Sequence, residues 1–73
     1  MTTEQATDLQ NTLEDMMNRI TKGDDITEQL LRIEQLSVDI ELTAPKMLKH
    51  YLEKKSYTKA LDFLKDQDLR SPP

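Results

Sequence analysis

Apolar residues in the first third of the chain recur at the spacing of one helical face. They stand three, four, three and four positions apart, at Ala6, Leu9, Leu13, Met16 and Ile20. This spacing is typical of an amphipathic helix and of a short coiled-coil seam. Thr2 and Gln5 have the spacing of a capping box, and Lys22 followed by Gly23 is a typical helix end. The pattern predicts a helix over residues 4–21.

A second helical pattern starts at Asp25, which with Glu28 has the spacing for reciprocal capping of a first turn. Apolar residues line one face of this segment or flank it, at Ile26, Leu30, Leu31, Ile33 and Leu36. Only residues 22–24 link it to the first helix. So short a link favours an antiparallel helical hairpin.

Residues 37–43 have a different pattern, in which Val38, Ile40 and Leu42 alternate with acidic residues. Alternation of this kind is typical of a strand. The sequence offers no second strand to pair with it. We therefore expect one helical turn, or an extended connector, that buries the three apolar side chains.

Two further helices are predicted in the second half of the chain, over about residues 45–55 and 57–67. Thr43 can cap the first of them and Pro45 fits its first turn, while Ser56 can cap the second. The apolar face of the first comprises Met47, Leu48, Tyr51 and Leu52. The inner face of the second comprises Tyr57, Ala60, Leu61 and Leu64, with Phe63 beside them.

These segments predict an all-α fold, a small bundle of four short helices with a connector turn. It occupies residues 1–68 as a single helical interaction domain, and residues 69–73 form a disordered tail. The stripe in residues 4–21 can be core or a homodimer seam. A coiled coil normally needs three or four heptads, so we favour core. The expected core is Leu9, Leu13, Met16, Ile20, Leu30, Ile33, Leu36, Met47, Leu48, Leu52, Leu61 and Leu64.

The composition of the chain makes several classes of function unlikely. The net charge is −4, whereas nucleic-acid-binding domains are usually basic, so nucleic acid is an unlikely partner. No cysteine and one histidine leave no basis for a disulfide or a zinc site, and we expect no metal and no cofactor. The chain has neither an apolar run long enough to cross a bilayer nor a signal-peptide pattern, so we expect no membrane contact and an intracellular location.

Candidate catalytic groups have structural explanations. His50 lies on a lysine-rich helix face, where a lone histidine is most often solvated; Glu53 can orient its ring, but local spacing brings no nucleophile near. The acidic pair at residues 14–15 lies on a polar helix side, and the pair at 24–25 lies at a helix start, which favours negative charge. A single glycine excludes a glycine-rich phosphate loop. We expect no enzymatic activity.

Lysines gather in an otherwise acidic chain. Residues 46–59 hold five lysines and one acidic residue, whereas residues 1–30 hold seven acidic and two basic residues. The lysines form either a solvated face or an electropositive rim that selects an acidic partner while apolar anchors hold it. On the second interpretation the chain docks a short acidic–hydrophobic segment of another protein beside the third and fourth helices. The candidate partner-binding residues are Lys46, Lys49, His50, Lys54 and Lys55.

The order of these features resembles the TFIIS N-terminal domain family of transcription factors over about residues 26–64. The resemblance is carried by a leucine-rich helix, a short segment with β-branched residues and Glu, a threonine, and a helix ending in leucine and basic residues. Those parts are residues 30–36, residues 38–42, Thr43, and Leu52, Lys54 and Lys55. Ala44 and Pro45 stand where the family has glycines, and the last helix lacks the usual tryptophan. The resemblance implies an adaptor in transcription regulation, in the nucleus.

Residues 47–67 also resemble the LisH motif, a helical hairpin that dimerises. Its pattern of an apolar residue, Tyr, Leu and a later Tyr matches Leu48, Tyr51, Leu52 and Tyr57, with Ser56 where the motif has glycine. This resemblance implies a homodimer with a shared core, which is the alternative to a docking module.

Overall fold

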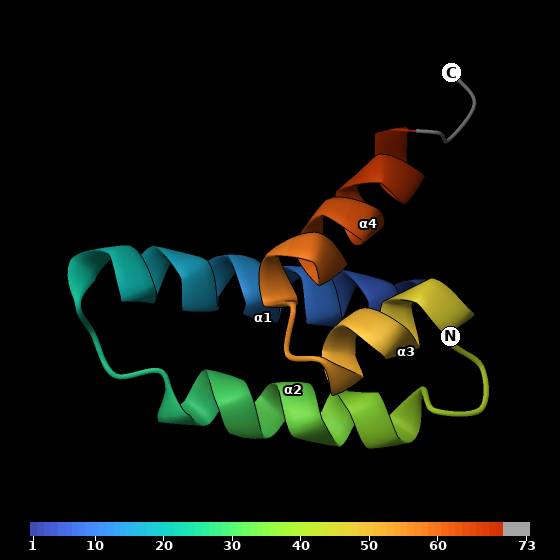
Figure 1. The fold of residues 1–73 in the computed structure, drawn as a ribbon, viewed down its shortest axis with the longest axis horizontal. Helices are drawn as coiled ribbons and strands as arrows, with labels where there is room; N and C mark the ends of the chain where they lie inside the picture. Colours follow the sequence, from blue (N-terminus) through green and yellow to red (C-terminus); the bar gives the residue numbers. More distant parts are fainter. Residues whose placement is uncertain (70–73) are drawn as a thin grey trace.

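Four α-helices make up the computed structural model, which describes residues 1–69 (Figure 1). They are α1 (Thr3–Lys22), α2 (Thr27–Asp39), α3 (Lys46–Glu53) and α4 (Tyr57–Leu69). No strand occurs in the described part of the chain. The predicted all-α bundle of four helices is confirmed. The predicted disordered tail falls, from residue 70 onward, outside the described residues.

The ends of α1 follow the predicted cap chemistry. The Gln5 backbone N–H donates to Thr2 Oγ1 at 3.1 Å, and the Thr2 N–H donates to Gln5 Oε1 at 2.9 Å. At the other end Gly23 takes a φ of 78°, a left-handed conformation that glycine adopts at little cost. Both caps depend only on residues that are close in sequence, so the bounds of α1 were predictable to within one residue.

The start of α2 differs from the prediction. The helix begins at Thr27, and Ile26 is the N-cap residue with no side-chain cap bond. The Asp25 carboxylate instead accepts from the Thr27 backbone N–H at 3.0 Å and from its hydroxyl at 2.7 Å. These bonds commit Asp25 to a local turn, so the predicted reciprocal capping with Glu28 is wrong.

The end of α2 also differs, because the helix continues past Leu36 to Asp39. Val38 and Asp39 are therefore helical, and the next three residues form a turn. The prediction that all three apolar residues of this segment are buried is wrong. Ile40 is 1% exposed, whereas Val38 is 71% and Leu42 98% exposed. The helical period explains the difference: Ile33, Leu36 and Ile40 share the inner side, and Val38 lies two residues further around the helix.

The start of α3 uses Pro45, not Thr43, as its N-cap residue, with no side-chain cap bond. The Thr43 N–H donates to the Ile40 carbonyl at 3.0 Å, which holds Thr43 in the turn after α2. The predicted cap by Thr43 is therefore wrong. After α3, Lys55 takes a φ of 57°, and the Ser56 N–H donates to the Tyr51 carbonyl at 2.8 Å. This left-handed residue makes the tight turn into α4.

The core matches most of the predicted list. Among the described residues the buried apolar side chains are Leu9, Leu13, Met16, Ile33, Leu36, Ile40, Leu48, Leu52, Ala60, Leu61 and Leu64. Leu30 is only half-buried, and Ile20 and Met47 are wrong as core residues, since they are 51% and 52% exposed. Ile20 lies in the last turns of α1, which extend beyond the point where α4 crosses α1 (Figure 1).

A polar seam joins α1 and α2. The Gln29 amide, which is 9% exposed, donates to Asp15 Oδ2 at 2.9 Å, and Arg19 Nε lies 3.1 Å from the same oxygen. Arg32 pairs with Asp8 further along the hairpin. Because these partners must stand opposite one another, they define the register of the hairpin.

Helix packing leaves one side of the bundle open. Helix α1 packs on α2 and on α4, and α4 packs on α3. The backbones of α2 and α3 make no comparable contact. The helices therefore follow the spatial order α2–α1–α4–α3, and the seam between α2 and α3 is open (Figure 1).

Candidate functional site

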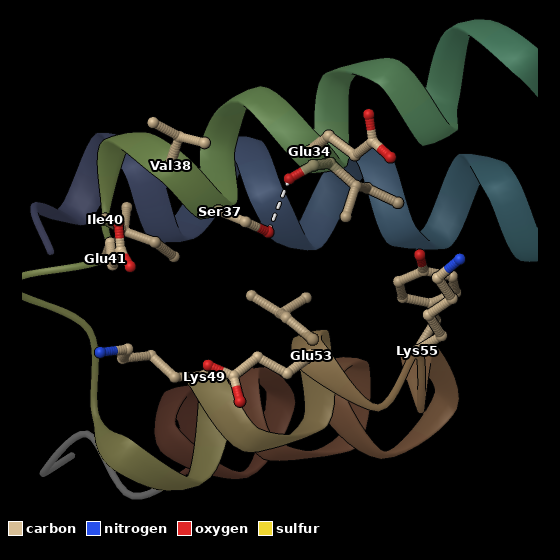
Figure 2. A pocket seen from close by; sticks show the side chains of 11 residues that line it. Glu34, Ser37, Val38, Ile40, Glu41, Lys49, Glu53 and Lys55 are labelled. Atoms are coloured by element: carbon tan, nitrogen blue, oxygen red, sulfur yellow. Dashed lines mark hydrogen bonds between the residues drawn. The ribbon is translucent and has the colours of Figure 1, made fainter.

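A cleft of about 430 Å³ occupies the open seam between α2 and α3 (Figure 2). One wall comes from α2 and the two residues after its end, and the other comes from α3 and the turn that follows. Its lining residues are Ile33, Glu34, Ser37, Val38, Ile40, Glu41, Lys49, Leu52, Glu53, Lys55 and Tyr57. The volume lies within the range of about 300–1,000 Å³ typical of binding pockets.

Helical periodicity positions both walls. On the α2 side the lining residues fall at positions 33–34, 37–38 and 40–41, which are successive turns of one face. On the α3 side positions 49 and 52–53 have the same relation. The two faces run along the cleft and make it a groove, so any occupant lies between two helical ridges.

The floor of the cleft is apolar. Ile33 is 2% exposed, Ile40 1% and Leu52 9%, and all three belong to the core. Val38, at 71% exposure, stands at the edge of the groove (Figure 2). Ser37 adds little polarity, because its hydroxyl already donates to the Ile33 carbonyl at 2.8 Å. Such a floor can bury apolar side chains of an occupant.

The walls carry charges of opposite sign. Glu34 and Glu41 come from the α2 side, and Lys49, Glu53 and Lys55 from the α3 side. Glu41 and Lys49 lie toward one end of the groove, and Glu34 and Lys55 toward the other (Figure 2). None of these five groups forms an ion pair with another side chain of residues 1–66. They are free to meet charges from outside.

Tyr57 at the start of α4 closes one end of the cleft. Burial raises the pKa of its hydroxyl, and the nearby negative charge of Glu34 raises it further. The hydroxyl therefore stays neutral at physiological pH and offers one donor to an occupant.

The structure brings together only part of the lysine set predicted from the sequence. Lys49 and Lys55 line the cleft, whereas Lys46, His50 and Lys54 do not. The cleft lies between α2 and α3, not beside α3 and α4 as expected, and its charges are mixed. The role of these five residues in partner binding stays a prediction.

Sequence reasoning missed the α2 wall, which contributes Glu34, Val38 and Glu41. One signal was present. Leu31 and Val38 stand seven positions apart, so they share a helix side other than the one that holds Ile33 and Leu36. Leu31 is 57% exposed. A helix with apolar residues on a second side indicates a surface beyond the core.

Other chemistry is sparse in the described residues. No three histidine, cysteine or acidic side chains of residues 1–66 lie close enough to hold a metal ion. In the same range no helix is both long and apolar enough for a bilayer crossing. A second, smaller hollow over the α1–α2 seam is lined by polar residues, two of which, Gln29 and Asp15, bond to each other: Asn11, Thr12, Asp15, Glu28, Gln29 and Arg32.

Comparison of the chain with protein-family models, with curated proteins and with solved structures found no match. The description of the site therefore depends on the geometry and chemistry of the chain itself.

Proposed function

We propose that the chain is a protein-interaction module that docks a short segment of another protein in the cleft between α2 and α3. The observation that carries this proposal is the groove itself, with its apolar floor of Ile33, Ile40 and Leu52 and its charged walls. Buried apolar anchors supply most of the energy in such interfaces, and surrounding charges supply selectivity.

Exposed apolar side chains near the groove support the same proposal. Val38 lies at its edge, and Leu42, in the turn after α2, is 98% exposed. Covering large apolar side chains with a partner removes them from water, which lowers the free energy and favours binding. The expected acidic–hydrophobic segment would place its acidic residues near Lys49 and Lys55, and the glutamates of the same cleft favour basic residues on its other side.

The setting in transcription regulation, as an adaptor in the nucleus, is part of this proposal. It depends only on the resemblance of residues 26–64 to the TFIIS N-terminal domain family. The geometry of the cleft is equally suited to a partner from another process.

A displayed library of random 16-residue peptides tests the docking function. Selection on the intact chain should enrich peptides with apolar anchors, and Ser37→Trp, which fills the cleft, should abolish their binding. Gln35→Trp is the matched control, because residue 35 lies two positions away on α2, is exposed and does not line the cleft. Peptides that bind all three proteins equally would contradict the proposal.

Sedimentation equilibrium separates docking from the LisH-type alternative. A docking module should be a monomer at micromolar concentration. A stable dimer at that concentration would favour the homodimerisation module and would remove the proposed peptide groove.

A further inference from the structure

We infer that the occupant of the cleft is an amphipathic helix of another protein, with a basic flank toward α2 and an acidic flank toward α3. This inference deepens the docking function proposed above and depends on it. It comes from the helix order, the length of the groove and the placement of charge on its two walls.

The open seam has the dimensions of a helix-binding groove. The helices follow the order α2–α1–α4–α3, so one more helix between α3 and α2 would complete the ring. The α2 wall extends over positions 33–41, which at 1.5 Å per residue is about 12 Å, or about two helical turns. An occupant helix would therefore present apolar residues at i, i+3 or i+4, and i+7 to the apolar lining of the cleft. Within that lining Val38 is the most exposed residue, and Leu52 keeps a small exposed surface.

An extended occupant has less to bind. Peptides that bind as strands pair with an unpaired sheet edge, and residues 1–69 contain no strand. The backbone groups of both walls are already used within α2 and α3. Recognition must then come from side chains, which is the mode of a helix in a groove.

Charge on the walls selects the flanks of that helix. Glu34 and Glu41 line the cleft from the α2 side, and Lys49 and Lys55 line it from the other, with no ion-pair partner among the described side chains. Lysine or arginine on one flank of the occupant would pair with the first wall. Glutamate or aspartate on the opposite flank would pair with the second.

Glu53 makes the two flanks unequal. It lies on α3 between the two lysines in sequence and lines the same wall, so it lowers the positive potential there. The basic flank of the occupant should therefore contribute more than the acidic flank. The expected order of affinity is a mixed-flank helix first, an all-basic helix second and an all-acidic helix last.

A second copy of the chain is a poor occupant. Helix α2 exposes two large apolar residues, Leu31 and Val38, whereas α1 and α3 expose only one each. Helix α2 also carries Glu28, Glu34 and Asp39, so an α2 placed in the groove would set acidic residues against an acidic wall. Each copy also carries a net charge of −4. Like charges in close contact oppose association, and the partner is a different chain.

Titration of the isotope-labelled full chain with synthetic 16-residue helices tests the inference. All the peptides have the same leucine face, and their flanks are Lys and Glu, Lys only, or Glu only. At low salt the mixed peptide should bind with a Kd about tenfold below that of the all-Glu peptide, with chemical-shift changes centred on Ser37, Val38 and Leu52. Equal Kd values for all three peptides would overturn the charge assignment.

Binding direction gives a sharper test. A second mixed peptide has its Lys and Glu flanks exchanged, so it can satisfy both walls only by binding in the reverse direction. A spin label at the peptide N-terminus should broaden signals near Glu41 for one peptide and near Lys55 for the other. The same direction for both peptides would overturn the inference.

A pair of charge-reversal variants links the effect to the α2 wall. Glu41→Lys should raise the Kd of the mixed peptide several-fold, and the helix fold should tolerate it because a cation is favourable after a helix C-terminus. Asp62→Lys is the matched control, since it changes the net charge equally on α4 at an exposed residue outside the cleft. An equal loss in both variants would contradict a specific contact with Glu41.

The two proposals fail in different ways. If library peptides bind at the cleft but no designed helix does, the helical occupant is wrong and the docking function stands. The docking function itself is wrong if library selection yields no peptide whose binding is abolished by Ser37→Trp.

Discussion

The two long faces of α2 differ in how they are used. Toward α1, the helix buries Ile33 and Leu36 and pairs Gln29 with Asp15, so apolar and polar groups both have partners. Toward α3, the same helix and the turn after it line an open cleft with Glu34, Val38 and Glu41, and the two charges lack ion-pair partners among the side chains of residues 1–66. The first face holds the hairpin together, and the second is left for another molecule.

The comparison shows that burial alone does not distinguish the two faces. Ile33 and Ile40 are almost fully buried, and yet both contribute to the floor of the cleft. The difference lies in what stands opposite. On the α1 side another helix packs along α2, whereas on the α3 side the two helices share part of the core and border a cleft.

The largest expected effect contrasts Leu13, which is 0% exposed in the packed interior, with Leu52 at the cleft floor. Leu13→Ala should lower the free energy of unfolding by about 3–5 kcal/mol, because a closed cavity remains. Leu52→Ala should cost only about 1–2 kcal/mol, because solvent or shifted side chains fill the space. Urea denaturation followed by circular dichroism measures both. Equal losses would show that the α3 side is as tightly packed as the α1 side.

A smaller effect is expected at the polar groups of the two faces. Gln29→Ala removes the buried amide that donates to Asp15 and should cost about 1–2 kcal/mol. Ser37→Ala, on the cleft side, removes a hydroxyl that bonds only to its own helix at Ile33 and should change stability by less than about 0.5 kcal/mol. The same denaturation experiment checks the difference, and a larger loss for Ser37→Ala would reverse the assignment of the two faces.

The turn at the end of the cleft wall offers a stabilising change. Lys55 has a φ of 57°, so Lys55→Gly should raise the free energy of unfolding by about 0.5–1 kcal/mol. The neighbouring Lys54 has an ordinary φ of −82°, and Lys54→Gly should lower stability by a similar amount. Changes of opposite sign in the melting temperatures of the two variants support the turn geometry, and changes of the same sign contradict it.

The smallest effect is a pH dependence of the α1–α2 face. Hydrogen bonds from Arg19 and then Gln29 lower the pKa of Asp15 below its usual 3.8, and bonds from Thr27 lower that of Asp25. A carboxylate whose pKa is lowered in the folded state stabilises it above the unfolded pKa. Stability from this source should therefore be present near neutral pH and decline as the pH falls below about 4 through the folded values.

Denaturation of the chain between pH 6 and pH 2 measures that decline. Asp15→Asn should flatten part of it while leaving the other carboxylates unchanged. A variant with the same pH profile as the unmodified chain would show that the seam does not stabilise the ionised form of Asp15.

Several features were determined by the sequence alone, because they depend on residues only a few positions apart. The capping box of Thr2 and Gln5 and the left-handed Gly23 act within one helical turn, and they set both ends of α1. The 3.6-residue period likewise selected Leu9, Leu13 and Met16 as core residues. Local hydrogen bonding and periodicity leave little freedom at these positions, so the four helices were predictable.

The site was decided only by the tertiary structure, because helices that are distant in sequence form it. No sequence pattern within α2 indicates that Glu34 and Glu41 would line the same cleft as Lys49 and Lys55. That outcome depends on the direction of the turn after Ile40 and on α3 packing mainly against α4. Packing of this kind also left Ile20 and Met47 exposed on otherwise apolar stripes, since a stripe is buried only where another helix reaches it.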